Sequence, residues 1–237
     1  MARPRMKTIG IIGGSTDLAT VEYYKIINAK TRERLGGFHT GRVIINSMDL
    51  ADSVQYVHNE LWEQGGEMLH EMAKSLERAG ADMILCVSNT WHRTAEMFMK
   101  DVSIPLLHIV DPTAEAIKKA NLTKVALLGT KATMSAPFLR DRYREKFGIE
   151  IIVPTTWEQD LIDRVIFHEL SFWKFMEESK EAYLRIIDNL HNKGAQGIIL
   201  GCTEIPLLVS QVDRPKLPMF DTLRLHAEAA VVTATRE

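Results

Sequence analysis

Cys202 stands where a buried apolar segment ends and a helix is expected to begin. The backbone N–H groups at such a turn can hold an anion, for example a substrate carboxylate. The helix dipole favours the thiolate over the thiol, so we expect the pKa of Cys202 to lie below its ordinary value of ~8.5. A thiolate beside a bound carboxylate is suited to removing the proton from the carbon next to it. The alternative is a buried core cysteine, which is our prediction for Cys86.

The segment that contains Cys202 repeats an earlier one. Residues 80–90 (GADMILCVSNT) align without a gap on residues 194–204 (GAQGIILGCTE) at a constant offset of 114, which places Ser88 over Cys202. Two copies of one α/β unit would explain the repeat, and a chance likeness between two strands is the alternative. Because ligands bind beyond the carboxyl ends of strands in open α/β sheets, two facing copies would place Ser88 and Cys202 on opposite sides of one cleft.

Polar side chains near these turns are candidate substrate ligands. They are Ser15, Asn89, Thr90, His92, Thr130, Thr133, Thr203 and Glu204. His92 lies about one helical turn after Ser88, where it could orient a catalytic group, bind substrate or face solvent. The histidines show no metal-ligand spacing, which predicts that the chain has no metal site. The pair Gly13-Gly14 lacks the GxGxxG pattern of a dinucleotide site.

Short apolar runs alternate with segments of helical periodicity along the chain. The expected strands are Thr8–Ile12, Arg42–Asn46, Met83–Val87, Pro105–Val110, Lys124–Leu128, Glu150–Val153 and Gly197–Leu200. The expected helices are Leu18–Leu35, Leu61–Ala79, Thr90–Met99, Pro112–Ala120, Pro137–Phe147, Gln159–Phe167, Met176–Lys193 and Thr222–Ala234. Continuous Val, Ile and Leu strands that alternate with helices are typical of an α/β fold whose parallel sheet is covered on both faces.

The composition excludes several classes of protein. The 237 residues are 46% hydrophobic and 25% charged, which is typical of a globular chain that buries its own core. A net charge of −2 argues against nucleic acid as a partner, and no apolar run reaches the ~18 residues of a membrane span. The basic start, Met1–Lys7, is followed too soon by polar residues for a signal peptide. With only two cysteines, the chain is expected to be cytoplasmic.

Several motifs, in order along nearly the whole chain, resemble the cofactor-independent aspartate/glutamate racemase family. They are Ile9–Gly14 with Ala19-Thr20 and Tyr23-Tyr24, Ser88–His92, Leu127–Thr130 with Thr133-Met134, Gly201–Ile205, and Phe220–Thr222 with His226–Glu228. The resemblance implies two pseudo-symmetric Rossmann-like halves, residues 1–113 plus 215–237 and residues 114–214, with the active site in the cleft between them. It also implies a homodimer, a small-molecule substrate and no cofactor. In the family, one cysteine from each half acts as base and acid on the two faces of the substrate α-carbon.

One departure concerns the first of these cysteines, which is Ser88 here, whereas Cys202 matches the second. A serine hydroxyl is a far weaker base than a thiol, so the symmetric mechanism does not carry over. The surrounding motifs resemble a branch of broad acidic-amino-acid racemases that prefer one direction. Our hypothesis is that Cys202 removes the α-proton of one enantiomer. Ser88, helped by His92 or water, returns a proton to the opposite face, and the reverse reaction is slow.

A second departure concerns the distal carboxylate of the substrate. Some family members bind it with an arginine after the second strand, but Ile45–Met48 contains none. Lys131, Arg164 or Lys174 could serve instead. Two alternatives to racemisation stay open: single-cysteine enolate chemistry, as in a decarboxylase or isomerase of a small dicarboxylate, and a carboxylate-binding protein that is not an enzyme.

Overall fold

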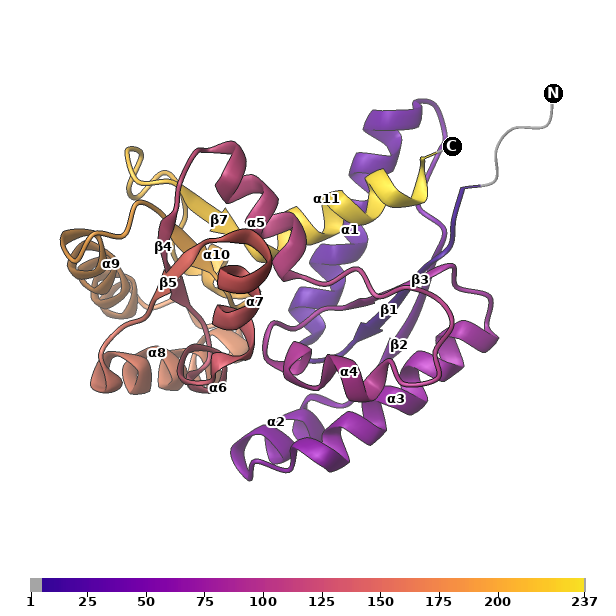
Figure 1. The fold of residues 1–237 in the computed structure, drawn as a ribbon, viewed down its shortest axis with the longest axis horizontal. Helices are drawn as coiled ribbons and strands as arrows, with labels where there is room; N and C mark the ends of the chain where they lie inside the picture. Colours follow the sequence, from indigo (N-terminus) through magenta and orange to yellow (C-terminus); the bar gives the residue numbers. More distant parts are fainter. Residues whose placement is uncertain (1–5, 237) are drawn as a thin grey trace. The chain divides into compact units, whose positions relative to one another are not determined.

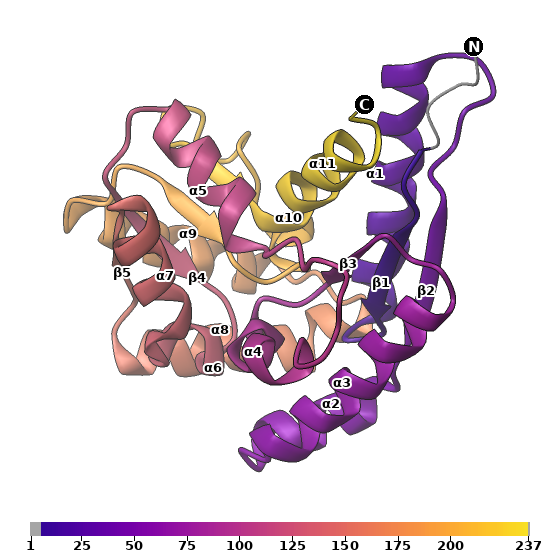
Figure 2. The ribbon, with the colours of Figure 1, turned by 45° about the vertical axis from the view of Figure 1, so that its right-hand side comes forward.

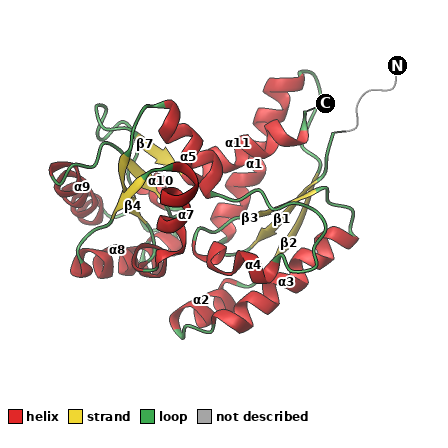
Figure 3. Cartoon of the chain, viewed as in Figure 1, coloured by secondary structure: helices red, strands yellow, loops and turns green. Residues whose placement is uncertain are grey.

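The computed structural model describes residues 6–236, and Met1–Arg5 and Glu237 lie outside the described residues. The expected absence of a signal peptide concerns Met1–Lys7 and so falls mostly outside this range. The described chain forms two compact units (Figure 1). The first ends at Ile109 and resumes at His226, and the second spans Val110–Leu225. Both units combine helices with a central sheet (Figure 3).

Within the described residues, the first unit contains a three-stranded parallel sheet in the order β2-β1-β3. Its strands are β1 (Ile9–Gly13), β2 (Val43–Ser47) and β3 (Met83–Cys86). Its helices are α1 (Asp17–Leu35), α2 (Leu50–His58), α3 (Trp62–Arg78), the 3-10 helix η1 (Thr90–Thr94) and α4 (Ala95–Phe98). Leu106 extends this sheet by a single parallel bridge to Ile84 of β3.

Helices cover both faces of the first sheet, with α1 and α3 on opposite sides (Figures 1 and 2). Ile12 of β1 packs in a cluster with Leu69 and Leu76 of α3. Gly13 faces the other way, because a Cβ added there would lie 2.8 Å from the Thr20 methyl carbon on α1. Side chains of a strand alternate between the two faces, so burial on both sides explains the continuous apolar pattern of β1.

The second unit contains, among the described residues, a four-stranded parallel sheet in the order β5-β4-β6-β7. Its strands are β4 (Lys124–Leu128), β5 (Glu150–Ile152), β6 (Ile198–Leu200) and β7 (Met219–Asp221). Its helices are α5 (Val110–Lys119), α6 (Lys131–Ser135), α7 (Pro137–Phe147), α8 (Thr156–His168), η2 (Leu170–Phe172), α9 (Glu177–Asn192) and α10 (Ile205–Leu208), and the start of α11 (Thr222–Ala234) belongs to it as well.

The second sheet is also buried on both faces. Ala126 and Leu128 of β4 pack in a cluster with residues of α8 and α9, whereas Val125 and Leu127 pack with residues of α5 and α7. The alternation along β4 follows the two-residue period of a strand. The predicted α/β fold with parallel sheets is therefore confirmed in both units.

The repeat seen in the sequence corresponds to the same strand order in both units. In the first unit β1 lies between β2 and β3, and Leu106 follows β3; in the second unit β4 lies between β5 and β6, and β7 follows β6. The division of the chain lies at Ile109 and Leu225, whereas the sequence placed it after residues 113 and 214. The later boundary has a physical reason, because β7 pairs with β6 and so belongs to the second unit.

Some elements differ from their sequence-based expectation. The helices α2 and α6 and the strand β7 were not expected, because each is short and has no full apolar period. The predicted helix Thr90–Met99 is divided into η1 and α4. The predicted strand Pro105–Val110 is wrong beyond the bridge at Leu106, because Val110 already begins α5. A short apolar run does not by itself distinguish a strand from a buried helix start.

Candidate active site

The turn after β1 is shaped by a glycine. Gly14 has a φ of +83°, and a Cβ added there would lie 2.0 Å from the main-chain oxygen of Met48. The Gly14 N–H donates to the Thr20 hydroxyl at 2.9 Å, which holds the turn against α1. Thr16 caps α1 with its hydroxyl. Ser15 lies half-buried in this turn, beyond the carboxyl end of β1.

Ser88 lies beyond the carboxyl end of the neighbouring strand, β3, and is 8% exposed. The Val87 N–H donates to the Ile12 oxygen at 3.1 Å and keeps this turn beside the end of β1. The Ser88 hydroxyl accepts a hydrogen bond from the Trp91 N–H at 3.4 Å. Asn89 and Thr90 are buried in the same turn. Within residues 6–236, no titratable side chain has a hydrogen bond to the Ser88 hydroxyl.

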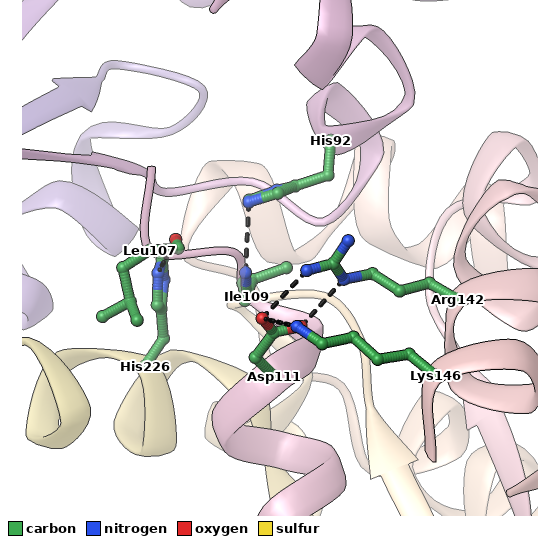
Figure 4. A network of polar contacts seen from close by, with 7 residues as sticks. All are labelled: His92, Leu107, Ile109, Asp111, Arg142, Lys146 and His226. Carbon is green, nitrogen blue, oxygen red and sulfur yellow. Dashed lines mark hydrogen bonds and ion pairs between the residues drawn. The ribbon is translucent and has the colours of Figure 1, made fainter. Parts of the chain in front are cut away.

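His92 holds the main chain around Ser88. The ring is 3% exposed, its Nδ1 lies 2.7 Å from the Ser88 main-chain oxygen, and the Ile109 N–H donates to its Nε2 at 3.2 Å (Figure 4). Both ring nitrogens therefore have main-chain partners. These two bonds give no support to the hypothesis that His92 helps the Ser88 hydroxyl to deliver a proton, and that hypothesis stays a prediction.

In the second unit, a close approach of two strand ends places Cys202 beside the turn after β4. The Gly201 N–H donates to the Leu128 oxygen at 2.7 Å. A Cβ added at Gly201 would lie 2.7 Å from that same oxygen, so only glycine allows this spacing. Thr130 and Cys202 consequently follow neighbouring strands at the same edge of the sheet. This is the edge at which open α/β sheets bind ligands.

Thr130 and Thr133 build the start of α6. The Thr130 hydroxyl accepts the Thr133 N–H at 3.2 Å and donates to the Thr133 hydroxyl at 3.0 Å. Thr133 is fully buried, so its hydroxyl supports the cap from inside the fold. The Lys131 N–H, at the first position of the helix, donates to the Asp163 carboxylate at 2.6 Å.

The Cys202 thiol lies against a carboxylate. Its Sγ donates to Oε2 of Glu204 at 2.9 Å, and the Thr203 hydroxyl donates to the same oxygen at 2.8 Å. Glu204 is 2% exposed. Burial raises the pKa of Cys202 well above its ordinary value, and the negative charge of Glu204 raises it further. The expected lowered pKa is therefore wrong: α10 is only four residues long, and the adjacent carboxylate opposes the thiolate.

Other acidic and phenolic groups near Cys202 come from α8 and α9. The Asp163 carboxylate also raises the pKa of Cys202, although burial and Glu204 have larger effects. Tyr183 is buried, and its hydroxyl donates to the Ile162 oxygen at 3.1 Å. Burial raises the pKa of Tyr183, and the charges of Cys202 and Glu204 add to this effect. Asp163 and Tyr183 could not be predicted from the sequence, because neither stands in a motif or near Cys202 along the chain.

Cys86 differs from Cys202 in its exposure and in its surroundings. It is buried in the α3 side of the first core, and burial raises its pKa to about 12. The prediction that Cys86 is a core residue is confirmed. Cys202 is partly exposed.

The three basic residues considered for the distal carboxylate are not equivalent. The Lys131 Nζ lies 2.5 Å from Oδ1 of Asp160, so this ammonium already has a counter-ion. Arg164 and Lys174 are exposed, and within the described part of the chain neither forms an ion pair. They are the more available of the three.

Two further features bear on the class of protein. Among residues 6–236, no group of three or more His, Cys, Asp or Glu side chains could hold a metal ion. No helix in the described chain is long and apolar enough to cross a membrane. The cytoplasmic location stays a prediction.

Comparisons with known proteins agree on one family. A family model described as Asp/Glu/hydantoin racemase matches residues 9–230. The structure of a proposed Asp/Glu racemase from Yersinia pestis is 40% identical with a TM-score of 0.89, over 98% of this chain and 100% of that one. An aspartate racemase homologue from Pyrococcus horikoshii is 37% identical with a TM-score of 0.82, over 98% and 100%. The broad-specificity amino-acid racemase RacX of Bacillus subtilis is 24% identical over 161 residues, 68% of each chain.

Proposed function

The chain belongs to the Asp/Glu/hydantoin racemase family and is an isomerase of the amino-acid racemase type, and on this premise we propose that it inverts aspartate, glutamate or both without a cofactor. The observation that carries the proposal is the Cys202 thiol, hydrogen-bonded to the Glu204 carboxylate beyond the carboxyl end of β6. A thiol with an adjacent proton acceptor can become the base that removes an α-proton. The similarity to an Asp/Glu racemase and an aspartate racemase homologue supports acidic substrates.

The resting side chain of Cys202 is a thiol, because burial and Glu204 both raise its pKa. We propose that the thiol passes its proton to Glu204 when substrate binds, which leaves a thiolate beside a neutral carboxylic acid. The thiolate then takes the α-proton and becomes a thiol again. The electron pair of the broken C–H bond stays on the substrate as a carbanion delocalised into its α-carboxylate.

On the opposite face of the α-carbon, the proposed proton donor is the Ser88 hydroxyl or a water that it holds. Ser88 then regains a proton from water, and Glu204 returns its proton to water. The protein and solvent together therefore gain and lose no protons over the whole reaction. Because serine is a weak base, removal of the α-proton by Ser88 should be slow. The two enantiomers have equal free energy in achiral solution, so kcat/KM is equal in both directions. A difference in rate between the two directions must therefore appear in kcat and in KM by the same factor.

The remaining polar residues fall into two groups. The proposed substrate contacts are Ser15, Asn89 and Thr90 in the first unit and Thr130 and Thr203 in the second. We propose supporting roles for His92, Thr133 and Glu204 instead, because these three are the most deeply buried, with 3% exposure or less. The backbone N–H groups at the caps of α1 and α6 can hold the α-carboxylate.

We propose Lys174 or Arg164 for the distal carboxylate, because both are exposed and lack an ion pair among the described residues. Replacement of the responsible residue by alanine should raise KM for aspartate severalfold. Lys131→Ala is the matched control, since Lys131 already pairs with Asp160, and its KM should stay within about twofold. Unchanged KM in all three variants would leave backbone N–H groups as the remaining candidates.

The test of the proposed function is proton NMR of the purified protein in D₂O with L-aspartate, L-glutamate and their D-forms. The α-proton signal of a substrate should disappear with the wild-type protein and persist with Cys202→Ala. Cys86→Ala is the matched control, because it removes the other thiol, which is buried.

Each outcome of this test has a distinct meaning. Exchange that depends on Cys202 identifies the substrate and supports abstraction by the thiol. If the α-proton exchanges with solvent faster than the chiral centre inverts, Ser88 returns protons poorly to the opposite face. Absence of exchange with all four amino acids would overturn the proposal and favour the dicarboxylate chemistries or a carboxylate-binding protein, which a panel of malonates would separate.

We also propose that the protein is a homodimer in solution. The first unit exposes apolar side chains that a partner copy would cover, among them Val21 and Tyr24 of α1 and Ile45 of the edge strand β2. Sedimentation analysis that shows only a monomer at micromolar concentration would contradict this.

A further inference from the structure

Two buried histidines hold the segment by which the chain leaves the first unit (Figure 4). The Nε2 of His226 lies 2.8 Å from the Leu107 main-chain oxygen. Two residues later, the Ile109 N–H donates to Nε2 of His92. Both rings are buried, and their centroids lie 6.2 Å apart. One ring thus binds a carbonyl and the other an amide of the same short segment.

The partners of His92 determine its protonation state. A backbone N–H can only donate, so Nε2 of His92 must be the unprotonated acceptor for Ile109. A carbonyl oxygen can only accept, so Nδ1 must carry the proton that is donated to Ser88. The ring is consequently neutral, in the Nδ1–H tautomer. In that form no ring nitrogen is left to bind substrate or to exchange a proton with it.

We propose that His92 is a positioning residue: in its neutral Nδ1–H form it orients the main chain of Ser88 through Nδ1, while the Ile109 N–H holds the ring in that tautomer. For catalysis this rests on the proposed function. The Ser88 hydroxyl itself is held only by a 3.4 Å contact from the Trp91 N–H among the described residues. The 2.7 Å bond from His92 to the Ser88 carbonyl is therefore shorter than the contact that holds the hydroxyl.

The neighbouring side chain shows that the turn is anchored throughout. The Trp91 indole N–H donates to the Ser53 hydroxyl of α2 at 2.9 Å, and its ring packs so closely on α3 that only glycine fits at position 65. Trp91 fixes the Ser88 turn against α2 and α3, and His92 fixes it against Ile109. Because a displacement of about 1 Å can cost on the order of 100-fold in rate, loss of either anchor should be visible in kcat.

Three substitutions separate the two bonds of His92. In His92→Asn the amide nitrogen can occupy the position of Nδ1 and still donate to the Ser88 carbonyl. In His92→Gln the longer side chain can place its oxygen near Nε2 and still accept from Ile109. His92→Ala removes both bonds.

The chain also offers a matched control. In His191, Nδ1 lies 2.8 Å from the main-chain oxygen of Ala195, so it makes the same kind of ring-to-carbonyl bond across four residues. His191 is exposed on α9, in the second unit. His191→Asn and His191→Ala report what such a bond contributes to folding when no catalytic turn is attached.

The first readout is kinetic and uses the whole enzyme well below its unfolding temperature. His92→Ala should lose about 100-fold in kcat with KM within about twofold, and His92→Asn should recover most of that loss while His92→Gln should not. The His191 variants should keep wild-type kcat. Wild-type kcat in His92→Ala would overturn the proposal, and so would equal losses in the Asn and Gln variants, which would indicate a general structural role.

The second readout needs no activity. NMR of protein labelled with ¹⁵N-histidine should show His92 as a neutral ring protonated at Nδ1, and hydrogen exchange at the Trp91 amide should quicken in His92→Ala. An Nε2–H or doubly protonated ring, or unchanged exchange, would overturn the positioning role. If the wild-type protein fails to exchange any substrate α-proton, the proposed function fails while this readout still decides how His92 holds the turn.

Discussion

The Ser88 turn and the Cys202 turn follow equivalent strands of two similarly ordered sheets, yet they are built in different ways. The Ser88 turn is held by neutral groups: the Trp91 indole, the His92 ring and main-chain amides. The Cys202 turn places its thiol on a buried carboxylate, that of Glu204. The first turn is rigid and uncharged, whereas the second contains a proton donor and a proton acceptor side by side.

This difference bears on the proposed reaction, which uses one thiol. The Cys202 thiol has an acceptor for its proton, whereas at Ser88 it is the main chain that is held closely, by the 2.7 Å bond to His92. The two turns therefore differ in what they offer to the proposed proton donor and the proposed base. The comparison can be tested by changing one turn at a time.

The largest effect is expected from Cys202→Ala. General acid–base groups contribute about 10² to 10⁴-fold to a rate, so α-proton exchange should fall by about 10³-fold or more. Cys86→Ala should leave the exchange rate within about twofold, because that thiol is buried and its pKa is raised to about 12. More than a tenth of wild-type exchange in Cys202→Ala would mean that another group removes the α-proton.

Ser88→Cys makes the two turns more alike and restores the two-thiol pattern of the family. A thiol is a much better base than a hydroxyl, so kcat in the slow direction should rise by about 10-fold or more. The ratio of the two kcat values, measured from pure L- and pure D-substrate, should move towards one. A ratio that stays at its wild-type value would show that Ser88 does not cause the asymmetry.

Glu204→Gln removes the charge that distinguishes the Cys202 turn while keeping its shape. Because Glu204 raises the pKa of Cys202, its neutralisation should lower that pKa, and alkylation of Cys202 by iodoacetamide should begin at lower pH. Cys86 is buried, so the alkylation rate reports on Cys202. Glu150→Gln, an exposed carboxylate paired with Lys124, is the matched control. An unshifted alkylation profile in Glu204→Gln would contradict the electrostatic account.

Gly65→Ala tests the anchor of the Ser88 turn. A Cβ at this position would lie 2.3 Å from an atom of the Trp91 ring, so the indole must move. Overpacking of this kind destabilises a fold by about 1–3 kcal/mol, measurable by denaturant unfolding. Ser53→Ala should cost about 1–3 kcal/mol through the unpaired indole N–H. Wild-type stability in both variants would show that the Trp91 anchor contributes little.

The smallest effect is expected in the ion-pair group at the start of α5 (Figure 4). Burial alone would raise the pKa of Asp111, but Arg142 and Lys146 lower it below its ordinary value. Lys146→Ala should cost less than ~1 kcal/mol, because Lys146 is exposed and both Arg142 bonds remain at 2.8 Å. The contribution of these ion pairs to the free energy of unfolding should be fully present above the ordinary pKa of an Asp carboxyl. It should be lost as the pH falls below that value and through the lowered pKa of Asp111. A larger loss at neutral pH would contradict this ranking.

Most of the fold could be predicted because its determinants are local. The apolar runs at β1, β3, β4 and β6 and the helical periods between them are properties of neighbouring residues, and the aligned repeat located Ser88 and Cys202 at equivalent strand ends. The strand β7 was not predicted, because a run of three residues is too short to show the two-residue hydrophobic period of a strand. Its pairing with β6 depends on the rest of the sheet.

The sequence by itself determined the α/β class, the repeat and the two turns that bear the candidate acid and base. Only the tertiary structure decided their chemistry. Cys202 has a raised pKa because the fold buries it beside Glu204 and brings Asp163 near from α8. His92 is neutral because its partners include Ile109, which the fold brings to its ring. Burial and the proximity of charges depend on contacts between distant parts of the chain, which no local pattern of residue types reports.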